Sequence, residues 1–262
     1  MNLGISTASY YPLETESALE NIGKDGIKTA EIFFNANIEL KQSFIDILLK
    51  IQKKYGLNIP SVHPTMSLAE SFMIFSAYER RFNESLDMFS RYSEIAAELG
   101  AKYIILHGGK PNGILSDKEY CERYMQLKNV TLKNGVTVLQ ENVAHYRAGD
   151  IEFLRSMRDI LGSDAEFCID IKQSIRCGYN PFDIINEFHD NIKHYHISDH
   201  SSASDCQLPG NGKFNFNDFF DLTQKHGYYG SYVIEVYDNS YKEYSEIKES
   251  FLFLKNCIAN YR

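Results

Sequence analysis

The chain has 262 residues, a formal net charge of −8 and a sequence pI near 5.5, and 44% of its residues are hydrophobic against 24% charged. This balance is that of a globular protein with a large core, and it excludes a chain dominated by disorder. The acidic balance argues against nucleic acid as a partner, since DNA-binding surfaces are basic, and favours a small substrate that is neutral or whose charge is met by a metal.

The N-terminal sequence and the cysteines predict a cytoplasmic protein without a membrane segment. The start, MNLGIST, is neither basic nor followed by a long apolar stretch, so we expect no signal peptide. No apolar run approaches the length that spans a bilayer. The five cysteines are scattered and form no CxxC pair, which indicates reduced thiols and neither disulfides nor a sulfur-ligated zinc.

A short apolar run followed by a longer amphipathic stretch recurs along the chain. In chain order, these runs predict eight strands: Leu3–Thr7, Thr29–Phe34, Ile59–His63, Tyr103–His107, Thr137–Glu141, Glu166–Asp170, Ile192–Ser198 and Tyr232–Val236. Six of these strands follow a glycine at a position where a helix would stop. Glycine ends a helix at low cost because it readily takes the left-handed conformation, and the six are Gly26, Gly56, Gly100, Gly135, Gly162 and Gly227. Eight strands alternating with helices predict an α/β protein with one domain over residues 1–262, a closed parallel (β/α)8 barrel.

Helix starts between these strands agree with the alternation. Ser116 followed by Glu119 predicts a capping box, and Asn180 before Pro181 predicts an N-cap with proline at the first helical position. The helix expected over 85–99 has one apolar face, as an outer helix of a barrel requires.

Titratable residues stand at the ends of consecutive predicted strands, where a barrel of this kind carries its active site. Glu141, Asp170, His196 and Glu235 belong to the last four strands. Buried carboxylates are costly unless paired and repel each other in a small space, so these four residues predict a divalent metal site. Three carboxylates and one imidazole suit Mn²⁺, Mg²⁺ or Co²⁺, and zinc is also compatible.

His63 and His107 end the third and fourth predicted strands. Either they orient substrate or bond within the rim, or they join Glu141 in a second, nitrogen-rich site that zinc would fill. The aromatic residues Phe33, Phe34, Tyr195 and Tyr237 either line a sugar pocket or pack in the core.

Further candidates for substrate contact are Glu31, Lys172 and Lys213. Glu31 is alternatively a buried glutamate bonded to neighbouring strands. Lys172 shares the face of Asp170 and would bind a phosphate or carboxylate, or else be a solvated lysine at the rim. Lys213 follows Gly210 and Gly212, whose N–H groups would cradle a phosphate or simply form a turn before a helix capped near residues 215–217.

The strand-end residues and three local strings resemble the xylose isomerase-like TIM barrels along the whole chain. The strings are SVHP, HISDH, and LPGNGKFN followed by FFDLTQKHGYYGSYVIEVY. This superfamily includes sugar-phosphate isomerases and epimerases, hydroxypyruvate isomerases, inosose dehydratases and the endonuclease IV group. The resemblance implies one metal on Glu141, Asp170, His196 and Glu235, with Glu141 and Glu235 also acting as base and acid.

The activity implied is a metal-dependent isomerisation or epimerisation of a sugar or sugar phosphate, by proton transfer through an enediolate. An inosose dehydratase would use the same chemistry, and the sequence does not separate the two. A non-catalytic sugar-binding barrel would not need two opposed glutamates. The resemblance also implies a homo-oligomer, since this superfamily often forms dimers or tetramers.

The sequence departs from the family pattern at two places. Gln173, another candidate for substrate contact, stands where the epimerases and endonuclease IV often have a histidine, and Gln207 after Asp205 replaces a ligand of the third zinc of endonuclease IV. A three-zinc nuclease is therefore not expected, whereas a two-metal phosphoesterase using His63 and His107 stays open. The arginine that epimerases place after the strand-seven histidine is absent, which leaves the sugar open.

Overall fold

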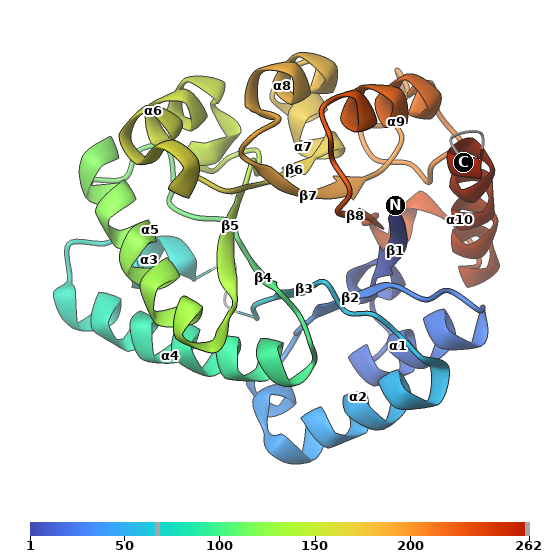
Figure 1. Ribbon diagram of the computed structural model, residues 1–262, viewed down its shortest axis with the longest axis horizontal. Coiled ribbons are helices and arrows are strands. Elements are labelled where there is room, and N and C mark those ends of the chain that lie inside the picture. Colours follow the sequence, from blue (N-terminus) through green and yellow to red (C-terminus); the bar gives the residue numbers. More distant parts are fainter. Residues whose placement is uncertain (66–68, 260–262) are drawn as a thin grey trace.

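The computed structural model describes residues 1–65 and 69–259 and confirms the (β/α)8 barrel. Eight parallel strands follow one another around the ring in sequence order, and β1 closes it by pairing with β8. The strands form the centre of Figure 1 and the helices surround them. Their bounds are β1 Asn2–Ser6, β2 Ala30–Phe33, β3 Ser61–His63, β4 Tyr103–Leu106, β5 Thr137–Glu141, β6 Phe167–Asp170, β7 Ile192–Ile197 and β8 Ser231–Ile234.

The helices alternate with the strands as expected. They are α1 Thr15–Lys24, α2 Gln42–Tyr55, α3 Glu70–Met73, α4 Glu79–Glu98, α5 Asp117–Thr131, α6 Ile151–Leu161, α7 Ile171–Arg176, α8 Pro181–Phe188, α9 Phe216–Lys225 and α10 Tyr244–Ala259. Among the described residues, no helix has the length and apolarity that a membrane span requires.

The local signals in the sequence correspond to real helix ends. Ser116 and Glu119 form the predicted capping box of α5, and Asn180 caps α8. All six predicted helix-stop glycines have a positive φ, between 60° and 79°. Asn215 caps α9 by accepting a hydrogen bond from the Asp218 N–H. The five cysteines are free thiols.

Side-chain alternation along the strands places the functional residues inside the barrel. Ile105, Leu139 and Cys168 form a small apolar layer separate from the main core between strands and helices. Two residues further on come the polar side chains of His107, Glu141 and Asp170, which share the inward face because side chains alternate with a period of two. The polar site therefore lies directly above an apolar plug at the C-terminal end of the barrel.

Candidate functional site

The other three predicted metal ligands converge on the Nδ1 atom of His196. This atom lies 2.9 Å from Glu141 Oε1, 3.4 Å from Glu235 Oε2 and 3.9 Å from Asp170 Oδ2. All four residues offer a ligand atom within 4.8 Å of the others. Ligand atoms held at about 2.0–2.2 Å from one ion are separated by up to roughly 4.4 Å, so this set fits a single divalent cation with small adjustments.

Burial makes this group of carboxylates receptive to a cation. Burial raises the pKa of Asp170 to about 7 although the neighbouring Lys172 ammonium opposes the shift, and Glu141 and Glu235 add to the rise. Burial also opposes ionisation of Glu141, but contacts with His107, His196 and His63 hold its pKa well below the usual range. A group of anions packed this closely is stabilised by any cation placed among them.

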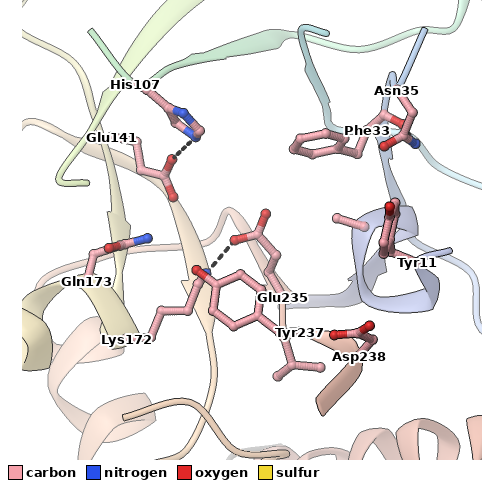
Figure 2. Close-up of a pocket in the computed structure, with 12 residues that line it drawn as sticks. Tyr11, Phe33, Asn35, His107, Glu141, Lys172, Gln173, Glu235, Tyr237 and Asp238 are labelled. Carbon is pink, nitrogen blue, oxygen red and sulfur yellow. Dashed lines mark hydrogen bonds and ion pairs between the residues drawn. The ribbon is translucent and has the colours of Figure 1, made fainter. Parts of the chain in front are cut away.

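Glu141 also belongs to a second group with His63 and His107. His107 Nε2 lies 3.1 Å from Glu141 Oε2, the contact drawn in Figure 2, and His63 Nε2 lies 3.8 Å from the same oxygen. The Glu141 carboxylate thus turns Oε1 toward the first group and Oε2 toward the histidines. Glu141 therefore belongs to two candidate ligand sets, and His63 and His107 with Glu141 would hold a second cation in a set richer in nitrogen.

Glu31 contacts His196 from the side opposite to the other carboxylates and does not line the pocket at the mouth of the barrel. Its carboxylate is fully buried, and Oε2 lies 3.0 Å from His196 Nε2, 2.7 Å from Ser61 Oγ and 3.5 Å from His194 Nε2. The position supports the alternative of a buried, hydrogen-bonded glutamate and does not support a substrate contact. A carboxylate that accepts from Nε2 fixes the imidazole so that Nδ1 faces the other carboxylates.

We expect the Glu31→Gln variant to bind a divalent metal about 10–100-fold more weakly than the wild type, the usual effect of losing a group that orients a ligand. Isothermal titration with Mn²⁺ measures this, and Glu39→Gln, also a buried glutamate but bonded to Thr15 and Asn35, is the control. Unchanged affinity in Glu31→Gln would contradict the orienting role.

Lys172 is buried within the site, so the prediction of a solvated lysine at the rim is wrong. Its side chain is 2% exposed, and Nζ contacts Asp170 Oδ2 and lies 2.6 Å from Glu235 Oε2. The burial follows from the start of α7, where Asp170 caps the helix by accepting from the Gln173 N–H. The first helical turn thereby directs Lys172 into the barrel mouth.

Gln173 lines the pocket, and its Oε1 accepts a hydrogen bond from the Ala144 N–H. Lys213, in contrast, is exposed and does not line that pocket. Of the two alternatives for Gly210 and Gly212, the structure has the turn before a helix and not the phosphate cradle. The Asp199 carboxylate accepts from the N–H groups of Gly210 and Gly212 at 3.0 and 2.9 Å and from that of Phe214 at 2.9 Å. An internal carboxylate therefore takes the place of an external anion.

Asp205 and Gln207, which the resemblance places at the third zinc of endonuclease IV, contact other residues of the chain. Arg176 binds the Asp205 carboxylate through two nitrogens, at 2.5 and 3.1 Å, and Gln207 pairs its backbone with Asp199. Asp205 is thus neutralised by a guanidinium. A carboxylate that a guanidinium holds in this way is less available as a metal ligand.

A pocket of about 260 Å³ opens onto Glu141 and Glu235, two of the predicted metal ligands (Figure 2). The aromatic side chains of Phe33, Tyr11 and Tyr237 form part of its wall, whereas Phe34 and Tyr195 pack in the core. The sequence interpretation did not identify Tyr11, Asn35 or Asp238, which also line the pocket: Ala8, Tyr11, Phe33, Asn35, His107, Glu141, Lys172, Gln173, Glu235, Val236, Tyr237 and Asp238. Their position could have indicated them, since Tyr11, Asn35 and Asp238 lie in the segments that connect a strand to the next α-helix.

Glu70 is a buried carboxyl next to the site that the sequence interpretation did not identify. One oxygen accepts the Gly108 N–H at 2.6 Å, and the other has no hydrogen-bond partner among the described residues. Burial raises the pKa of Glu70 to about 8, against the lowering effect of His107 and of the Gly108 N–H. The folded protein therefore keeps this carboxyl neutral near pH 7.

The raised pKa of the buried Glu70 predicts that the free energy of unfolding depends on pH. Between the unfolded pKa of 4.5 and the folded value of about 8, the folded state holds a proton that the unfolded state has lost, so the free energy of unfolding falls as pH rises through that window. Glu70→Gln removes this fall, and near pH 9 the variant is expected to be more stable than the wild type by a few kcal/mol, at about 1.4 kcal/mol per pKa unit.

Urea unfolding at pH 5 and pH 9 with a chelator present measures the difference, and the exposed Glu84→Gln is the control. An equal loss of stability from pH 5 to pH 9 in the wild type and in Glu70→Gln would contradict a neutral buried Glu70.

Comparison with known proteins identifies relatives of this chain. The family model described as a xylose isomerase-like TIM barrel matches residues 18–257. An uncharacterized protein of Mycobacterium tuberculosis is 24% identical over 277 residues, covering 96% of this chain and 94% of its own length.

Two solved structures show the same fold. A D-tagatose 3-epimerase-like protein is 21% identical, with a TM-score of 0.80 and coverage of 99% of this chain and 98% of its own. An AP endonuclease of family 2 from Brucella melitensis is 14% identical, with a TM-score of 0.78 and coverage of 100% and 99%. The match of the family model over almost the entire chain shows that this protein belongs to the xylose isomerase-like TIM barrel family.

Proposed function

We propose that this protein is a divalent-metal-dependent isomerase or epimerase acting on a carbohydrate. One observation carries the proposal: Glu141, the last residue of β5, and Glu235, which directly follows β8, both line the pocket and both belong to the ligand set around His196. Two carboxylates that reach the same small ligand can remove and return a proton from different directions. The aromatic wall of Phe33, Tyr11 and Tyr237 suits the apolar faces of a sugar ring or chain.

The residues would act in sequence on a hydroxy-ketone. Glu141, Asp170, His196 and Glu235 would hold the metal, which supplies Lewis-acid polarisation of the substrate carbonyl when bound. One glutamate would remove the proton from the carbon next to the carbonyl, leaving an enediolate. The other would return a proton to the opposite face of that carbon, which inverts it. Alternatively, the proton would go to the former carbonyl carbon while the hydroxyl proton passes to the former carbonyl oxygen, which isomerises the sugar.

A two-zinc phosphoesterase is the second candidate, favoured by the position of Glu141 between its two groups. His63 and His107 would hold the additional ion with Glu141 Oε2. The pairing of Asp205 with Arg176 and the net charge of −8 oppose a nuclease of the endonuclease IV type. A dehydratase that begins with the same proton abstraction is the third.

Metal analysis and solvent deuterium uptake test the proposal together. The purified protein is analysed for its elements and then incubated in D₂O with a panel of ketoses and ketose phosphates. About one equivalent of manganese, cobalt or magnesium with deuterium uptake at the α-carbon is the expected result. Two equivalents of zinc with cleavage of phosphoesters or abasic DNA would replace the isomerase proposal by the phosphoesterase, and loss of water from the sugar would replace it by the dehydratase.

A further inference from the structure

Lys172 and a metal ion would use the same two oxygens. Nζ of Lys172 contacts Asp170 Oδ2 and Glu235 Oε2, and these are the oxygens that face His196 Nδ1 in the ligand set. Figure 2 shows the lysine reaching Glu235 from below the pocket, with the Tyr237 ring in front of it. The ammonium therefore stands at the position from which a divalent cation would bind Asp170 and Glu235.

The backbone that carries Lys172 is fixed, so this contact does not result from a loose loop. Asn142 holds the main chain of Asp170, because its Oδ1 accepts from the Asp170 N–H at 2.7 Å and its Nδ2 donates to the Asp170 carbonyl at 3.2 Å. Ser174 Oγ donates to the same carbonyl at 2.9 Å. Only the flexible methylene chain of Lys172 is left to move the ammonium.

A divalent ion and the ammonium would compete for these two oxygens. Both are cations, and in a buried site of low effective dielectric their repulsion at contact distance is strong. Binding of one at Asp170 Oδ2 and Glu235 Oε2 therefore requires withdrawal of the other. The exit is the pocket, because Lys172 lines it and Nζ lies 5.6 Å from the centroid of the Tyr237 ring on its wall.

We propose that Lys172 is a built-in competitor for the metal: its ammonium binds Asp170 and Glu235 in one state and turns into the pocket when a divalent ion takes those oxygens. The inference rests on the proposed function for the identity of the ligand set. In the metal-loaded state the displaced ammonium faces the pocket as a donor toward an oxygen of the substrate. Metal binding and presentation of Lys172 are thereby coupled.

Metal affinity measures the competition directly. Wild type, Lys172→Met, Lys172→Arg and the control Lys193→Met are titrated with Co²⁺ and followed by calorimetry and by the visible absorption of the bound ion. Lys193 lies on β7 and donates to the Asp190 carbonyl, away from the ligand set. Lys172→Met is expected to bind Co²⁺ about tenfold more tightly or better, which corresponds to an ammonium-bound population of roughly nine-tenths in the wild type.

The charge-conserving variant separates competition from packing. Lys172→Arg keeps a cation and is expected to bind Co²⁺ no more tightly than the wild type. Equal or weaker binding by Lys172→Met would overturn the inference. Circular dichroism confirms the fold, and Lys172→Gln serves as a second neutral variant if Lys172→Met does not fold.

The four combinations of results distinguish this inference from the proposed function. Tighter binding by Lys172→Met over a measurable wild-type affinity supports both, and equal affinities overturn the inference alone. Binding by Lys172→Met without binding by the wild type supports the inference and overturns the metal-dependent function. Absence of binding in both overturns both.

Amine labelling tests the displacement of the ammonium. The wild type is treated briefly with acetic anhydride with and without Co²⁺, and the acetylated fraction of Lys172 is measured by peptide mass spectrometry. The fraction is expected to rise when Co²⁺ is present, while that of Lys193 stays constant. A lower or unchanged fraction at Lys172 would overturn its withdrawal into the pocket.

Discussion

Replacing Glu235 with glutamine is expected to leave the barrel folded and to slow exchange of the substrate α-proton by about 10²–10⁴-fold, the contribution of a positioned general acid or base. Glutamine has the same shape and retains an oxygen that can bind a metal, but it cannot take up a proton. The side chain is 12% exposed and lines the pocket, so it is within reach of a ligand. Deuterium uptake from D₂O into the ketose that gives the highest wild-type rate measures the effect.

Metal content is determined on the same preparation, because Glu235 has two proposed roles. If the variant holds as much metal as the wild type, the slower exchange results from the loss of proton transfer by Glu235. Asp205→Asn is the control, since the Asp205 carboxylate binds Arg176 and belongs neither to the pocket lining nor to the ligand set. Exchange at the wild-type rate in metal-loaded Glu235→Gln would remove Glu235 from the proton-transfer step.

The alternation of side chains explains why the convergence of Glu141, Asp170, His196 and Glu235 could be predicted from the sequence. A strand of a parallel barrel reads as an apolar run, and its last inward residue falls at the mouth whatever the details of packing. Errors of one or two residues at strand ends, such as the end of β4 at Leu106 and not at His107, do not change which residues converge. Glu141 and Asp170 follow Leu139 and Cys168 by two positions and share their face.

The partners of these residues could not be predicted, because they depend on contacts between distant parts of the chain. Glu31 reaches His196 across 165 positions, and Lys172 reaches Glu235 across 63. A glycine-rich string predicts free N–H groups, but the sequence does not say that Asp199 will occupy them. Glu70 lies on a four-residue helix, and nothing in its local sequence indicates that its carboxyl becomes buried.

Replacing Asp170 with asparagine is expected to weaken divalent metal binding by more than about 100-fold and to abolish proton exchange. The lower bound follows because loss of a group that only orients a ligand already costs about 10–100-fold. Asparagine retains Oδ1, which caps α7 by accepting from the Gln173 N–H, so the helix start survives. The amide replaces the charge of Oδ2, the oxygen that faces His196 Nδ1 and Lys172 Nζ.

Calorimetric titration with Mn²⁺ and deuterium uptake are measured on Asp170→Asn and on Asp205→Asn. Asp205 is an aspartate of the adjoining loop whose carboxylate binds Arg176 and is absent from the ligand set, so its variant is expected to bind metal as the wild type does. Parallel losses in both variants would indicate a general disturbance of the barrel mouth. Wild-type affinity in Asp170→Asn would show that the ion is held by another set of ligands. Among the sets that lack Asp170, the one of His63, His107 and Glu141 would favour the phosphoesterase over the isomerase.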